Sequence, residues 1–526
     1  MLKTFVYGNF RGGIQDRNVI RLPSTYLRDL VNFRVERGSL ITRKGTARRN
    51  ADVLESGAAI QGLHEYWDES QDNHLLVAVN GKIYRDDLDG DGPDNDITGS
   101  LSLETSQDAR WAWVNYDGAC YGTDGVTNFY IASSSAAAVA MTTLGRDVPS
   151  QSKAMAVLAE QLWLANFTDM DGTVRSYGTI HSDPLVDGTM AFLGSSGARN
   201  DFNRRWPVYK LQEHAVGNTD VLMIYKKKAI WWAQFAPSQS AAVTNFAYNR
   251  LPGNVGLSGP YGVVSTPEGL MHIDKPGIYW LPANDLTKPR YIGKPVETFW
   301  GSVEASRLYY VAAGEVPEQN GVIFCVPYGA DQSDNNRAIY INYESWAEEG
   351  LEADDLHPAM SIYKGVSDGY YAFNCLCRIQ DTDGRERLVG GGYDGYVYTI
   401  EEGTQDVDQN YICSATLPFI GDPSMQWAWQ DAIIDGDLNS EKVLSITQRN
   451  YDVDVPYEQI VTGGAKGFVL DESVLDLDVL GGDALGSMRA DLVGESRYME
   501  LEIKVLSGVE FAIHSVVVRA EADDTY

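Results

Sequence analysis

Residues Leu388–Ile400 read LVGGGYDGYVYTI, two short runs of alternating apolar and polar side chains on either side of Asp394–Gly395. Alternation with a period of two is typical of a half-buried strand. An Asp-Gly pair between two such runs is a strong hairpin signal. The stretch therefore predicts a β-hairpin. Because an isolated two-stranded hairpin is only marginally stable in water, this one needs other strands to pack against.

Comparable hairpins recur along the chain at intervals of about 40 residues. Turns are predicted at Asn80–Gly81, Asp117–Gly118, Ala159–Glu160 and Glu268–Gly269, and further strand pairs at Val221–Trp232 and Val322–Tyr343. This period is typical of four-stranded propeller blades. We therefore predict an all-β protein whose residues 51–410 form a β-propeller of six or seven blades. Residues 411–526, with alternating strands at Tyr498–Val505 and Phe511–Val518, predict an additional C-terminal β element. It is either a small sandwich or a set of strands that closes the ring.

The formal net charge is −31, and it is unevenly distributed. Residues 1–50 hold 11 Lys and Arg against 3 Asp and Glu, whereas the rest of the chain holds 31 against 70. We interpret residues 1–50 as a basic N-terminal arm that includes a first hairpin. A basic arm on an acidic body is self-complementary between protomers. The acidic body argues against a nucleic-acid clamp, because phosphate contacts need cations.

The cysteines and the apolar runs of the sequence indicate the cellular compartment in which the protein folds. Cys120, Cys325, Cys375, Cys377 and Cys413 are odd in number and form no CxxC pair, which disfavours a disulfide framework and favours folding in a reducing cytoplasm. No apolar run approaches the ~18 residues that a membrane span needs, so we expect no membrane insertion.

One motif indicates a metal site. Residues Asp87–Gly92 read DLDGDG, and oxygen ligands at alternate positions can wrap a calcium ion. Asp87, Asp89, Asp91 and Asp96 are the candidate ligands of this structural calcium. The twelfth position of the loop is Thr98 in place of a bidentate glutamate. A solvated acidic turn is therefore the competing interpretation, and no other cofactor is expected.

Catalytic signatures are weak. No G-x-S-x-G or Walker A motif occurs, and the histidines lack metal-ligand spacing. A carbohydrate-binding or carbohydrate-cleaving propeller is the alternative function, because carboxylate pairs are available and Trp111, Trp113, Trp231 and Trp232 are candidates for a sugar platform. Such tryptophans more often fill the space between blades. We expect a protein that is not an enzyme.

Several ordered segments resemble the propeller-type tail proteins of short-tailed bacteriophages. Residues Leu27–Thr46 are similar to the group's N-terminal signature, with Asn32, Gly38, Leu40, Arg43, Gly45 and Thr46 in the matching places. Gln161–Ala165 resembles an R-L-W-x-A strand, with glutamine in place of the usual arginine. Gly391–Tyr398 resembles a G-x-x-D-G-y-v-y blade, followed by Asp406. The resemblance spans residues 27–410 and covers tail nozzle (tail tubular protein B) and packaged-DNA stabilisation proteins.

This resemblance implies a virion protein assembled in the host cytoplasm as a ring, expected to be hexameric. The ring would enclose the DNA exit channel, which DNA passes without specific binding. Its partners would be copies of itself, an adaptor ring or portal above, and tail fibres or a tail plug below. Arg34, Arg37, Arg43 and Arg49 are the candidate docking residues for an acidic neighbour. The competing interpretation is that these arginines pack on their own chain's acidic surface.

Overall fold

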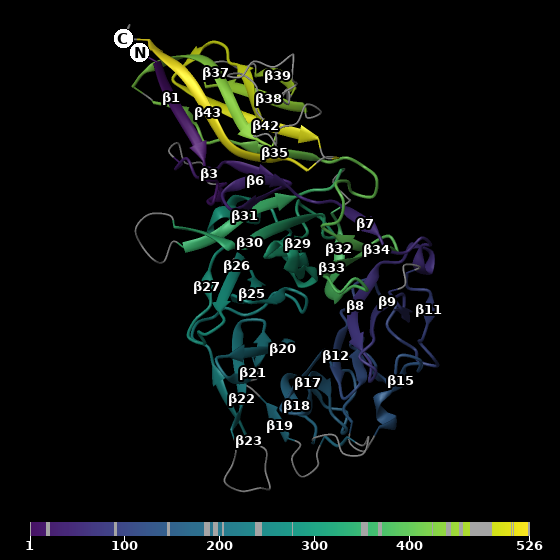
Figure 1. Ribbon diagram of the computed structural model, residues 1–526. Coiled ribbons are helices and arrows are strands. Elements are labelled where there is room, and N and C mark those ends of the chain that lie inside the picture. The colour runs from purple at the N-terminus through teal and green to yellow at the C-terminus, as the bar shows by residue number, and fades with distance from the viewer. Residues whose placement is uncertain are drawn as a thin grey trace.

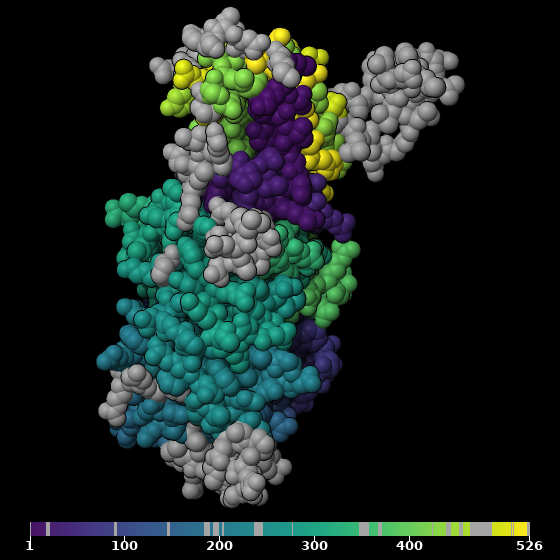
Figure 2. Space-filling view, turned by 90° about the vertical axis from the view of Figure 1, so that its left-hand side faces the viewer, coloured from purple at the N-terminus to yellow at the C-terminus, as the bar shows by residue number. Residues whose placement is uncertain are grey.

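The computed structural model describes residues 2–523 except 17–21, 89–91, 145–147, 184–189, 193–197, 202–204, 237–244, 276, 349–355, 367–370, 423, 438–442, 452–455, 463–485, 507 and 509. A ring of small sheets forms one end of the molecule and two larger sheets form the other, with both termini at the far end of the larger sheets (Figure 1). Figure 2 shows N-terminal residues lying against C-terminal ones above the body of the ring.

Six blades of the ring are separate four-stranded antiparallel sheets, and the strands of each are given from the innermost to the outermost. They are β8 (Ile60–Trp67), β9 (Asn73–Val79), β10 (Lys82–Asp86) and β11 (Asn95–Asp96); β12 (Ala112–Tyr116), β13 (Ala119–Thr123), β14 (Asn128–Ile131) and β15 (Val139–Ala140); β16 (Ala154–Leu158), β17 (Gln161–Thr168), β18 (Val174–His181) and β19 (Ala198–Asp201); β20 (Val208–Val216), β21 (Thr219–Lys226), β22 (Ala229–Ala236) and β23 (Asn245–Arg250); β24 (Val263–Thr266), β25 (Gly269–Asp274), β26 (Gly277–Pro282) and β27 (Arg290–Tyr291); and β32 (Phe373–Gln380), β33 (Glu386–Gly392), β34 (Val397–Ile400) and β7 (Thr46–Arg48).

A seventh four-stranded set stands in the ring between the last two of these sheets. It consists of β28 (Ala312–Val316), β29 (Gly321–Val326), β30 (Arg337–Glu348) and β31 (Leu356–Tyr363), and it forms the first part of a ten-stranded sheet. Innermost strand β32 contacts β8, and β7 pairs with β34, so the first and last parts of the ring share one sheet. The β-propeller prediction of six or seven blades is confirmed.

The predicted hairpins are present, and tight turns explain them. Asn80 and Asp117 adopt positive φ of 48° and 51°, each followed by a glycine that also has positive φ, as the right-handed twist of a two-residue hairpin requires. Ala159 and Glu160 form the same kind of turn without glycine. The hairpins fall on different strand pairs of their blades, β12–β13 in one and β9–β10 in another, which is why their spacing scatters around 40 residues.

Beyond the ring, two sheets pack face to face as a sandwich. One contains β40 (Gly486–Asp491), β37 (Gln426–Gly436), β43 (Ala512–Asp523), β6 (Ser39–Thr42) and β5 (Phe33–Glu36), with β1 (Leu2–Gly8) on β43 and β41 (Glu495–Ser496) on β37. The other continues the ten-stranded sheet through β4 (Asp29–Val31), β35 (Ile412–Thr416), β42 (Tyr498–Leu506), β38 (Val443–Asn450) and β39 (Tyr457–Thr462), with β36 (Ile420–Gly421) on β42. The C-terminal element is thus a sandwich.

Alternation along the sequence builds this core. On β42, Met499, Leu501, Ile503 and Val505 are buried while the residues between them are less so. One apolar cluster joins these side chains to Phe324 and Ile339 of the ring, so the sandwich and the propeller share a continuous core.

The N-terminal segment is not an arm, which corrects the sequence prediction. The first hairpin exists as β5–β6, but β6 pairs with β43, and β1 pairs with β43 from Leu2↔Glu521 onward. Strand β4 lies between β31 of the ring and β35 of the sandwich. Strands β1, β4, β5 and β6 therefore belong to the two large sheets, and β7 belongs to the closing blade.

The remaining elements are short. They are the parallel pair β2 (Gly13–Ile14) and β3 (Tyr26–Leu27), and the helices η1 (Leu54–Gly57), η2 (Met141–Thr143), η3 (Lys294–Val296), α1 (Glu297–Gly301), η4 (Ala305–Tyr310) and η5 (Pro317–Gln319). Among the described residues, no helix is long and apolar enough to cross a membrane. All five cysteines are free, as the sequence predicted.

Candidate functional site

A fully buried ion pair holds the junction between propeller and sandwich. Arg43, just after β6, donates from Nη2 to Asp406 Oδ2 at 2.5 Å and from Nη1 to Oδ1 at 2.9 Å. Its Nε donates to Asn32 Oδ1 at 3.0 Å, and its remaining donors reach the backbone oxygens of Lys44 and Lys364. The guanidinium therefore uses all of its hydrogen-bonding directions, which a buried charge requires.

Aromatic rings complete the enclosure. The Arg43 guanidinium lies 3.6 Å from the ring centroid of Tyr411 and 4.7 Å from that of Tyr371. Burial alone would lower the pKa of Arg43, but the Asp406 carboxylate outweighs burial and raises it above its ordinary value. The charge is thus held permanently, and it ties the turn after β6 to the turn after β34.

The backbone interlocks at the same place. Thr46 N donates to Gln405 O at 3.0 Å, and Val407 N donates to Thr46 O at 2.9 Å. A Cβ on Gly45 would stand 1.8 Å from the backbone oxygen of Gln405, so only glycine allows this approach. Asn32, Arg43, Gly45, Thr46 and Asp406 make up what we call the junction network.

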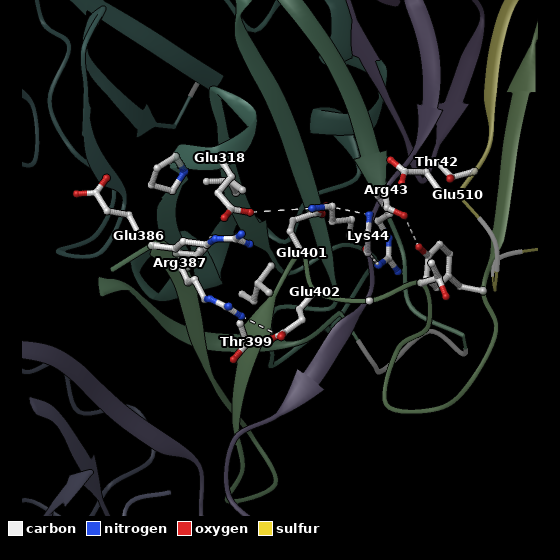
Figure 3. Close-up of a pocket in the computed structure, with 18 residues that line it drawn as sticks. Thr42, Arg43, Lys44, Glu318, Glu386, Arg387, Thr399, Glu401, Glu402 and Glu510 are labelled. Carbon is white, nitrogen blue, oxygen red and sulfur yellow. Dashed lines mark hydrogen bonds and ion pairs between the residues drawn. The ribbon is translucent and has the colours of Figure 1, made fainter. Parts of the chain in front are cut away.

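A cavity of about 310 Å³ opens beside the junction network. Figure 3 shows its charged side chains: Lys44 faces Glu318, at 4.0 Å, and Arg387 faces Glu402, at 2.9 Å. Glu401 lies at its inner end with its side chain 2% exposed. Charges of both signs line the cavity, so it favours neither an anion nor a cation strongly.

Glu401 is the most constrained acid of this cavity. Its Oε2 accepts from Lys44 N and from Gln319 Nε2, both at 2.9 Å, and Arg34 Nη1 stands 3.8 Å away. Burial raises the pKa of Glu401, and the two arginines, Arg34 and Arg43, oppose that shift only in part.

The structure corrects the docking prediction for three of the four arginines. Arg34 pairs with Glu36, Glu401 and Glu510, Arg43 with Asp406, and Arg49 with Asp86 and Asp381. These side chains serve the fold because their strands lie inside the sandwich and the closing blade. Only Arg37, in the turn between β5 and β6, is exposed, and its docking role stays a prediction.

The calcium prediction falls partly outside the described residues, because Asp89 and Asp91 lie there. Asp87 is held by His74 at 3.0 Å and by Arg85 at 2.6 Å, and Asp96 accepts hydrogen bonds from Thr98. Among the described residues, no group of three or more His, Cys, Asp and Glu could hold a metal ion.

The axis of the ring contains a second cavity, of about 650 Å³. Its walls come from the innermost strands, including His64 of β8, Asn115 of β12, Gln212 of β20 and Cys377 of β32. His64 Nε2 donates to Asn115 Oδ1 at 2.9 Å, and burial lowers the pKa of His64 to about 4. The cavity at the axis is therefore lined by polar side chains together with apolar ones such as Val263 and Leu376.

The tryptophan candidates do not form one exposed platform. Trp111 is 2% exposed, and its ring stacks on that of Trp113 at 5.3 Å between centroids. Trp231 and Trp232 are half-buried on β22. Trp111 therefore packs in the interior, as aromatic side chains between blades commonly do.

Sequence reasoning found Asn32, Arg43 and Asp406 as motif residues but not that they touch. It missed Tyr371, Tyr411 and Glu401, which belong to the same surroundings. No local signal could have found them, since each meets Arg43 or Lys44 from a position more than 300 residues further along the chain.

Comparisons with known proteins identify no family. No family model matches the chain, and no curated protein matches it. Among solved structures, the chain is similar to the Neurospora crassa Pan2 WD40 domain, with 9% identity, 70% of this chain and 98% of that chain covered, and a TM-score of 0.38. It is also similar to BBS1N in its complex with ARL6DN, with 8% identity, 70% and 100% coverage and a TM-score of 0.40. The Malassezia sympodialis allergen Mala s 1 matches with 9% identity, 66% and 96% coverage and a TM-score of 0.29. None of these likenesses bears on function.

Proposed function

We propose that the chain is a structural protein of a short-tailed bacteriophage tail, in which copies form a ring around the DNA exit channel as a nozzle or head-to-tail connector. The expected ring is hexameric, it retains packaged DNA, and it assembles in the host cytoplasm. The partners expected from the resemblance remain part of this proposal. They are the adaptor ring or portal and the tail fibres or plug.

One observation carries the proposal. Two segments that resemble the tail-nozzle group independently, 27–46 and 391–406, meet in the junction network. The matching residues Arg43, Gly45 and Thr46 meet Asp406 or its neighbour Gln405, about 360 positions away, and Asn32 accepts a hydrogen bond from Arg43. If the two segments matched the group by chance, their matching residues would not be expected to meet in one contact of the fold. This shared contact supports the proposal that the resemblance extends to the closure of the propeller by the strands that enter the sandwich.

The charge supports the same proposal. Since a channel from which DNA must leave should not retain phosphate, a chain of net charge −31 is suited to its wall. No observation here favours the carbohydrate alternative over this one.

The test is the mass of the purified chain and its place in a particle. We expect a closed ring of copies by native mass spectrometry and by negative-stain electron microscopy. Antibodies against the chain should label the tail of virions. A chain that stays monomeric at micromolar concentration and is absent from virions would refute the proposal.

A further inference from the structure

One face of the propeller presents an exposed carboxylate on every blade, whereas the opposite face has exposed carboxylates at only some of its described turns, among them Asp171, Asp331 and Asp394. In antiparallel blades, the turn between the first and second strands lies on one face and the turn between the second and third strands lies on the other. At or beside the first of these turns, every blade has an exposed carboxylate: Glu69, Asp117, Glu160, Asp220, Glu268, Glu318 and Asp383. We call this side the acidic face. Glu69, Asp117, Glu160, Asp220 and Glu268 form no ion pair with another described residue, whereas Glu318 pairs with Lys44 and Asp383 with Arg387.

On the opposite face, a hollow of about 220 Å³ forms where three consecutive blades meet. Lys227 and Lys228 come from the turn between β21 and β22, and Lys275 follows β25. All three lysines are exposed, and none makes an ion pair with a described residue. Ser258, Ser306, Tyr209 and Tyr309 also line this space, which we call the lysine hollow.

The lysine hollow is electropositive although the chain as a whole is acidic. Its carboxylate, Asp274, already accepts hydrogen bonds from the backbone N–H groups of Gly256, at 3.0 Å, and Lys275, at 2.7 Å. Three ammonium groups therefore face the space with one engaged carboxylate between them. An anionic occupant fits this arrangement.

The surroundings favour carboxylates over a nucleic acid. A second hollow shares Tyr309 with the first, and acids outnumber bases in its lining, which holds Glu104, Asp108 and Asp124 against Arg110 and Lys153. An extended phosphodiester backbone carries a charge at every nucleotide and would run onto these acids. Single carboxylate side chains on short turns can enter the lysine hollow without contacting the acids of the second hollow. The acidic face of the same protein presents such turns.

We propose that the lysine hollow of one copy receives the acidic face of a second copy, so that copies associate head to tail. This inference rests on the proposed function and names the contact that builds the ring. A head-to-tail contact joins two different surfaces, and it closes into a ring when the rotation between copies allows it. Two bodies of like charge repel each other, and the lysine hollow offsets that repulsion where they touch.

A charge-swap experiment tests the contact. One variant carries Lys227→Glu, Lys228→Glu and Lys275→Glu, and the other carries Glu160→Lys, Asp220→Lys and Glu268→Lys. All six positions are exposed, so both variants should keep the wild-type melting temperature. Lys3→Glu is the matched control, because Lys3 is an exposed lysine on β1 of the sandwich and belongs to neither of the two propeller surfaces.

Assembly is measured by sedimentation velocity and native mass spectrometry at low and high salt. We expect wild type and Lys3→Glu to form the ring, and each triple variant alone to assemble on the order of tenfold more weakly. Mixing the two triple variants should restore assembly, because each altered surface then meets its complement. Wild-type assembly should weaken as salt rises.

Each other outcome overturns the inference in a distinguishable way. Triple variants that assemble like wild type would place the ring contact elsewhere and leave the proposed function standing. A monomeric wild type would overturn both. Binding of a duplex DNA oligonucleotide that the lysine variant loses, with assembly unchanged, would reassign the lysine hollow to nucleic acid.

Discussion

Of the substitutions of charged side chains discussed below, Arg43→Met should destabilise the protein most. The substitution keeps much of the side-chain length but leaves Asp406 buried and unpaired. It also removes the donors to Asn32 and to the backbone oxygens of Lys44 and Lys364. Breaking a buried pair by removing one partner costs about 3–5 kcal/mol.

The assay is thermal and urea-induced unfolding followed by near-ultraviolet circular dichroism. An entropy of unfolding of about 2.1 cal/mol/K per residue, taken over the 526 residues, corresponds to about 1 °C of melting temperature per kcal/mol, so Arg43→Met should lower the melting temperature by about 3–5 °C. The double variant Arg43→Met with Asp406→Leu should recover part of the loss, because neither charge then stays buried alone. Arg37→Met, at an exposed turn, is the control and should change stability by less than about 0.5 kcal/mol.

A cost below about 1 kcal/mol for Arg43→Met would refute the reasoning, because a buried bidentate pair cannot be removed that cheaply from one side. A double variant no more stable than Arg43→Met would likewise show that the orphaned carboxylate is not the cause of the loss.

Three further outcomes are expected. His272 is fully buried, neither ring nitrogen has a hydrogen-bond partner among the described residues, and burial lowers its pKa from 6.5 to about 3. The stability that the neutral imidazole contributes is therefore fully present above pH 6.5 and is lost as the pH falls toward 3. In urea titrations, His272→Phe should reduce the loss of unfolding free energy between pH 6.5 and 4.5 by about 2–3 kcal/mol. Gly45→Ala should destabilise the protein by about 1–3 kcal/mol in the same unfolding assay, because its Cβ collides with Gln405. Gly172→Ala is the control: its Cβ meets no atom within 4 Å, so it should cost only the strain of its positive φ. Because Asp87 and Asp96 already have partners in the chain, the melting temperature should be the same in calcium and in a chelator; a rise in calcium that Asp89→Ala abolishes would contradict this.

The ring was predictable because its information is local. Alternating apolar and polar residues and a turn such as Asn80–Gly81 or Asp117–Gly118 predict each blade, and neither of these two signals depends on distant residues. The sandwich was predictable in kind for the same reason, since β42 and β43 alternate clearly.

The role of the N-terminal residues could not be predicted from local pattern. Their excess of positive charge suggested an arm, but β1 pairs with β43 across more than 500 positions, and the arginines find acids such as Asp406 and Glu510 near the other end of the chain. Charge counted in a window of sequence does not show which charges meet in the fold. Asn32, Arg43 and Asp406 stood out in the sequence as separate motif residues, and the structure shows that Arg43 contacts both of the others.

Electron cryomicroscopy of the purified, assembled chain tests the central claim most directly. The account predicts a closed ring of identical copies around an open channel, each copy showing a hollow propeller joined to a sandwich through the strands around Arg43. Isolated monomers under conditions where the chain is folded, or an assembly with no central channel, would contradict it.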